Sequence, residues 1–108
     1  MTESGKKPNA AQCRLLTVIE ILSGNEVFGM RLKEIAEAVA KTEDKASMTS
    51  VLHDLEALKA RGWAQQMEDT KWRLAAKPFQ CLTNLQWGLQ SAGLKLAEVQ
   101  QNYTRLPT

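Results

Sequence analysis

The sequence predicts a mainly α-helical fold with one small β-hairpin, because three patterns follow one another along its 108 residues. Three segments with apolar residues at spacings of three and four come first, as in amphipathic helices. Two short runs of alternating apolar and polar residues follow, as in a hairpin. A long helical pattern with few charges comes last. We therefore divide the chain into a tail (1–8), a compact domain (9–77), a C-terminal helix (78–104) and a second tail (105–108).

The composition is that of one ordinary folded domain. Hydrophobic residues make up 44% and charged residues 24%, and the formal net charge is +2. A charge this small neither requires nor excludes nucleic acid as a partner. No apolar run approaches the roughly 18 residues of a membrane span, and the start of the chain is too polar for a secretion signal. We therefore expect a cytoplasmic protein without membrane association.

The two cysteines do not suggest a metal site. Cys13 and Cys81 lie in helical patterns, and neither has a second Cys or a His at metal-ligand spacing. We expect both to be buried free thiols of a reducing compartment.

The first helix is predicted over 10–22, with Asn9 as its N-cap. Its apolar face is expected to contain Leu15, Leu16, Val18, Ile19 and Leu22. The run Ser23-Gly24-Asn25 then ends it. Residues 26–30 are expected to be extended and to pair with later strands, with Phe28 in the core.

The second helix is predicted from residue 31 or 32 to 40. Leu32, Ile35, Ala36 and Val39 point inward, whereas Lys33, Glu34 and Glu37 point outward. The polar segment 41–46 carries no helical stripe and is the turn before the next helix.

The third helix is predicted over 47–61, and the rest of the domain is organised around it. Ser47 suits the N-cap, and Gly62 can adopt the left-handed conformation that ends a helix. Its apolar face contains Val51, Leu52, Leu55 and Leu58. Its first turns expose Met48, Thr49, Ser50 and His53, which are short or neutral side chains suited to a DNA groove. An ordinary amphipathic core helix would have the same apolar face. The helix and turn that precede 47–61 and the hairpin that follows favour the recognition helix of a helix-turn-helix.

The hairpin is predicted from strands 63–67 and 71–75, joined by the polar turn Glu68-Asp69-Thr70. In the second strand Trp72 and Leu74 share one face and should point at the helices, so Lys71 and Arg73 point away. A hairpin directly after a recognition helix is a wing, and the domain is therefore predicted to be a winged helix-turn-helix. The acidic turn favours a wing that lies along the DNA backbone rather than in the minor groove.

The C-terminal helix has a heptad seam. Leu82, Leu85, Leu89, Ala92, Leu96, Val99 and Tyr103 follow spacings of three and four over three repeats. Gly88 and Gly93 each lower its helicity by about 1 kcal/mol relative to Ala, so packing must stabilise it. We expect a homodimer through this seam; the alternative is a helix that folds back over its own domain.

Several of these runs resemble the winged helix-turn-helix domain of the IclR-type transcription regulators. They are RLKEIAEAVA, TSVLHDLEALKARGWA and the closing KWRLA, and with the first helix the resemblance covers residues 10–76. It implies that Thr49, Ser50 and His53 face the bases and that Lys71 and Arg73 face the DNA backbone.

The chain departs from this pattern in two places. Residues 40–46 form a longer turn, and a single long helix replaces the large C-terminal effector-binding domain. Short proteins of this shape are similar to small stand-alone regulators of Mu-like phages and prophages. This resemblance implies no small-molecule effector and a location in the cytoplasm of a bacterium or a phage-infected host.

The leading hypothesis is a homodimeric, sequence-specific DNA-binding transcription regulator. The predicted base contacts are Met48, Thr49, Ser50 and His53. The predicted backbone contacts are Lys33, Lys45, Lys59, Lys71 and Arg73, with help from the N-terminal lysines. Asp54 and Glu56 count against it unless they pair with a cation. The alternative is a winged-helix protein-interaction module that does not bind DNA.

The residues offer no catalytic constellation. The single histidine, His53, is followed by Asp54, but neighbouring residues on a helix do not face each other. The sequence also has no Gly-rich phosphate loop and no paired-carboxylate motif. We expect no enzymatic activity, no cofactor and no metal.

Overall fold

The computed structural model describes residues 9–44 and 46–105, and side chains as far as residue 102. The elements follow in the order α1 (Ala10–Leu22), α2 (Leu32–Ala40), α3 (Met48–Ala60), β1 (Ala64–Gln66), β2 (Trp72–Leu74) and α4 (Ala76–Arg105). The predicted fold class, mainly helical with a small hairpin and a long last helix, is confirmed. The predictions for residues 1–8, for Lys45, for the side chain of Tyr103 and for residues 106–108 lie outside the described part.

The predicted capping residues set the ends of α1 and α3. The Asn9 side chain accepts hydrogen bonds from the amides of Ala11 and Gln12, and the Ser47 hydroxyl accepts one from the amide of Ser50 at 3.1 Å. Gly62 follows α3 with a φ of +80°, the left-handed conformation that glycine adopts without steric cost.

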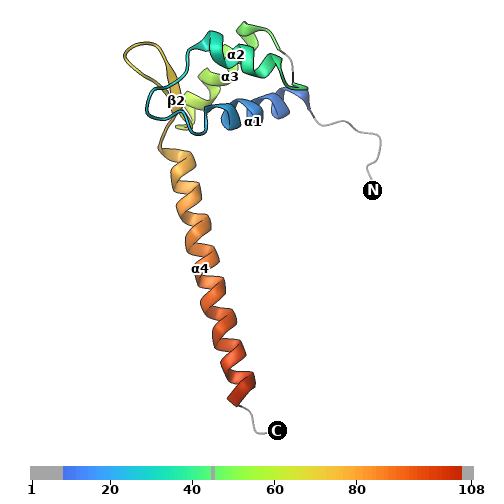
Figure 1. Ribbon diagram of the computed structural model, residues 1–108, viewed down its shortest axis with the longest axis vertical. Coiled ribbons are helices and arrows are strands. Elements are labelled where there is room, and N and C mark those ends of the chain that lie inside the picture. Colours follow the sequence, from blue (N-terminus) through green and yellow to red (C-terminus); the bar gives the residue numbers. More distant parts are fainter. Residues whose placement is uncertain (1–8, 45, 106–108) are drawn as a thin grey trace. The chain divides into compact units, whose positions relative to one another are not determined.

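The core lies where α1, α2 and α3 pack against one another, with β2 against α1 (Figure 1). Its fully buried side chains are Val18, Leu22, Ile35, Val39, Val51, Leu55 and Trp72. The apolar faces predicted for α2 and α3 are the ones that face this core. Because α3 packs against α1, α2 and β1, the orientation of its opposite, outer face is fixed.

The hairpin is antiparallel, with Gln65 opposite Arg73 and Ala64 opposite Leu74. Trp72 is buried and Leu74 packs against the core, as the alternation predicted. On the other edge of β2, Met30 and Trp72 exchange backbone hydrogen bonds of 2.8 and 2.7 Å. The predicted pairing of residues 26–30 therefore occurs at Met30 alone, and 26–28 form a turn.

Three predictions about burial are wrong. Phe28 is 79% exposed, because the turn between Gly24 and Gly29, both at positive φ, points it away from the core. Leu16 is 61% exposed, since it lies about 100° around α1 from Leu15 and so falls outside the face that meets α2 and α3. Cys81 is exposed and Cys13 is half-buried, so neither is the fully buried thiol that was expected.

The second compact unit begins at Pro78 and consists of the rest of α4, drawn orange to red in Figure 1. The helix starts at Ala76, two residues earlier than predicted, and Pro78 in its first turn needs no hydrogen-bonded amide. Every described side chain of α4 from Phe79 to Asn102 is exposed. Among the described residues no helix, including the 30-residue α4, is both long enough and apolar enough to cross a membrane.

Candidate nucleic-acid interface

The first compact unit ends at Lys77, and we call its described residues, 9–44 and 46–77, the winged unit. Its candidate interface is the outer face of α3. Val51, Leu55 and Leu58 are buried in the core, and this fixes the rotation of the helix about its axis. Thr49, His53 and Glu56 then follow spacings of four and three on the opposite side, and all are exposed. In a helix-turn-helix, the helix that enters the DNA groove is likewise packed on one face and exposed on the other.

An ion pair between Arg14 and Asp54 holds the middle of α3 against α1. Arg14 Nε donates to Asp54 Oδ2 at 2.5 Å, and Arg14 Nη2 donates to Asp54 Oδ1 at 2.9 Å. Asp54 is only 7% exposed, and its hydrogen bonds raise the pKa of the Arg14 guanidinium above its usual value. The carboxylate therefore points inward and is neutralised, so the sequence-based objection to DNA binding does not apply to Asp54. It still applies to Glu56, which lies on the outer face.

The turn before α3 is also fixed to α1. The Thr17 hydroxyl donates to Asp44 Oδ2 at 2.6 Å, and the amide of Asp44 donates to the Thr42 hydroxyl at 3.1 Å. Thr42 in turn donates to the backbone carbonyl of Val39, at the end of α2. The described part of this longer turn is thus an ordered connection between α2 and α3.

The Arg14–Asp54 and Thr17–Asp44 contacts were not predicted from the sequence. Asp54 lies three residues after Val51 and one before Leu55, so its spacing already placed it on the inner face of α3. Arg14 and Thr17 lie 40 and 27 residues from their partners, and no local pattern links such distant positions.

The predicted base-contacting residues do not all lie on the outer face. Met48, Thr49 and His53 are exposed. Ser50 is half-buried at the side of the helix, and its hydroxyl accepts a hydrogen bond from the Ser47 hydroxyl at 3.1 Å. The structure therefore places Thr49 and His53 on the outer face. Met48 is exposed in the first turn but is seven residues before Leu55 and so lies toward the core side of the helix, and Ser50 lies beside the N-cap.

The predicted phosphate-contacting cations are spread over three elements. Lys33 is exposed in the first turn of α2, and Lys59 is exposed in the last turn of α3. Lys71 Nζ lies 3.8 Å from Asp69 Oδ2 in the hairpin turn. Arg73 is on β2, on the face away from Trp72, as predicted.

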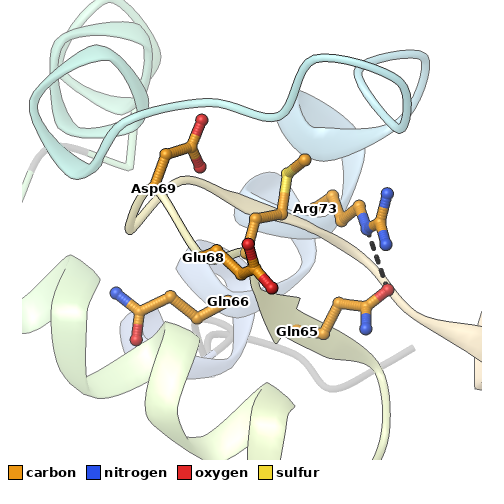
Figure 2. A pocket seen from close by; sticks show the side chains of 6 residues that line it. Gln65, Gln66, Glu68, Asp69 and Arg73 are labelled. Atoms are coloured by element: carbon orange, nitrogen blue, oxygen red, sulfur yellow. Dashed lines mark hydrogen bonds between the residues drawn. The ribbon is translucent and has the colours of Figure 1, made fainter.

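The hairpin side chains surround a shallow hollow of about 550 Å³ (Figure 2). Arg73 Nε donates to Gln65 Oε1 at 2.8 Å across the two strands, the bond dashed in Figure 2. Arg73 Nη1 donates to the backbone carbonyl of Glu26 at 3.3 Å, which joins the wing to the turn after α1. Glu68 and Asp69 bring negative charge to the tip. The cations of the wing are therefore partly engaged within the chain.

The winged unit as a whole is electrically balanced. Residues 9–77 contain ten Lys or Arg and ten Asp or Glu side chains, so the net charge of +2 comes from outside this segment. Affinity for a polyanion must then depend on where the cations lie and not on the total charge.

No family model matches this chain, and no curated protein is significantly similar to it. The resemblance to the winged domain of the IclR-type regulators remains a prediction from the residues quoted above.

Proposed function

We propose that the chain is a sequence-specific DNA-binding transcription regulator that inserts α3 into the major groove and acts as a homodimer. The observation that supports this most directly is the outer face of α3. Thr49 and His53 are open to solvent on a helix whose inner face is held by the core and by the Arg14–Asp54 pair. Because α3 is already held in place in the free protein, less conformational entropy would be lost when these side chains bind DNA.

The side chains on this face define how bases would be read. His53 can donate to guanine N7 or O6, and the Thr49 hydroxyl can donate or accept. Met48, exposed in the first turn beside this face, offers an apolar contact for a thymine methyl group. Glu56 on the same face can accept a hydrogen bond from the amino group of cytosine. An acid at this position disfavours non-specific contact with phosphate, and so makes binding more dependent on sequence.

The backbone contacts would come from Lys33 and Lys59 beside the groove and from Lys71 and Arg73 on the wing. Because Glu68 and Asp69 occupy the wing tip, the hairpin is better suited to lie along one strand than to enter the minor groove.

The homodimer would form through the seam of α4. Leu82, Leu85, Leu89, Leu96 and Val99 are all exposed on this helix. A second copy is a suitable partner because residues 78–94 carry no charge, so two identical helices meet there without repulsion. A two-fold dimer predicts an inverted-repeat site with half-sites one helical turn, or a multiple of it, apart.

A second candidate is a winged-helix module that binds another protein. The balanced charge of residues 9–77 and the acidic wing tip are the observations that favour it.

A salt titration separates the two candidates. We expect the protein to bind duplex DNA with an affinity that falls steeply with salt, and Lys71→Ala/Arg73→Ala to reduce the slope of log K against log salt by about one to two. The control is Lys41→Ala/Lys77→Ala, which removes two exposed lysines outside the proposed interface. Absence of binding to any duplex at low salt would contradict DNA recognition and favour the protein-binding module.

A further inference from the structure

The winged unit has an apolar groove beside the outer face of α3. It lies between α1 and the end of α3 and has a volume of about 310 Å³. Its lining includes Leu15, Leu16, Ile19, Leu58, Trp63 and Arg61. Apart from the Arg61 guanidinium this lining is apolar, and Leu16 at its edge is 61% exposed. A concave apolar surface of this size is suited to receiving apolar side chains.

The α4 helix has a second apolar stripe that the heptad seam does not use. Trp87 lies two residues from seam positions on either side, and so does Leu94, which places both on the face opposite the seam. They are 71% and 75% exposed. A pair of helices joined through the seam would leave both of them in water. We call Trp87, Leu94 and Glu98, one turn beyond Leu94, the back stripe.

The charges of the groove and the back stripe are complementary. Arg61 is the only charged residue among those lining the groove. Glu98 is the only acidic residue from 78 to 108. Among the described residues neither side chain has an ion pair or a hydrogen bond. Arg61 and Glu98 therefore each place an unpaired charge next to an exposed apolar surface.

We propose that the back stripe of one copy docks into the groove on the winged unit of a second copy. Leu94 would enter the hollow beside Leu16 and Trp63, and the Glu98 carboxylate would meet the Arg61 guanidinium at its edge. Leu94 and Glu98 are four residues apart and project from the same side of α4, so both contacts can form together. This is helix-in-groove recognition between copies of one chain. It is separate from the seam and does not rest on DNA binding.

Disulfide trapping between two different single-cysteine variants tests the contact. Both natural cysteines are first replaced by serine. Arg61→Cys is introduced in one preparation and Glu98→Cys in another, and the two are mixed without DNA and oxidised. We expect a cross-linked pair that contains one chain of each kind. The control mixes Lys41→Cys with Glu98→Cys, since Lys41 is exposed and does not line the groove. Mixed pairs no more abundant than in the control, or pairs of Glu98→Cys chains alone, would overturn the proposal.

A charge reversal adds a test in the protein without cysteine changes. Arg61→Glu and Glu98→Arg are each expected to weaken self-association about three- to tenfold, measured by sedimentation equilibrium. The double variant, which restores opposite charges, is expected to return to within about twofold of the starting protein. Lys41→Glu serves as the matched control and should have no effect. Two independent, additive losses would refute the pairing of Arg61 with Glu98.

Discussion

Replacing Arg14 with methionine would leave the Asp54 carboxylate buried between α1 and α3 without its cation. Removing one partner of a buried pair costs about 3–5 kcal/mol, and we expect the low end, about 3 kcal/mol, because the two side chains keep 18% and 10% of their exposure. Asp54→Leu should cost less, about 1–2 kcal/mol, since the longer Arg14 side chain can extend into water. Arg14→Met/Asp54→Leu should lie within about 1 kcal/mol of the starting protein, because no buried charge remains.

The assay is urea denaturation at fixed chain concentration, followed by tryptophan fluorescence, to which the buried Trp72 contributes the environment that changes most on unfolding. The four proteins form a double-mutant cycle whose expected coupling free energy is about 3–5 kcal/mol. Losses that simply add, or a loss below about 1 kcal/mol for Arg14→Met, would refute the view that this pair anchors α3.

Two further predictions concern the loop after α1 and the seam of α4. Gly29→Ala should lower the free energy of unfolding by about 2–3 kcal/mol, because the position has a φ of +73° and an added Cβ would lie 2.6 Å from the sulfur of Met67. Gly24→Ala, also at positive φ but with open space around it, should cost only about 1–2 kcal/mol; equal losses in urea denaturation would show that the close contact is unimportant. Leu89→Gln, at the centre of the seam, should reduce dimerisation in sedimentation equilibrium at least tenfold, because it places an amide in an apolar interface. Gln80→Ala, outside the seam, should not, and an unchanged dimer in Leu89→Gln would contradict the seam.

The sequence predicted the elements better than the contacts between them. The apolar spacing of Val51, Leu55 and Leu58 located α3 and its inner face, and Ser47 and Gly62 located its ends, since helical period and capping are local properties. The exposure of Phe28 was missed because it depends on a turn held at its far end by the distant pairing of Met30 with β2.

The candidate interface was also predicted only in part. Thr49 and His53 follow from the rotation of α3, which its apolar stripe defines. Ser50 was misplaced because its hydroxyl joins the N-cap, a detail of side-chain geometry that spacing does not give. The bond from Arg73 to the carbonyl of Glu26 joins positions 47 residues apart, so no sequence pattern could reveal that this cation is partly engaged.

The absence of charge in residues 78–94 has a consequence for how the protein would respond to ionic strength. Screening by salt weakens contacts between cations and phosphates, but it leaves the burial of leucine side chains almost unaffected. If the chain binds DNA as proposed and the seam joins two copies, rising ionic strength would release the DNA while the two copies stay together. The dissociated protein would then remain a preassembled pair, ready to bind an inverted repeat in one step when the ionic strength falls.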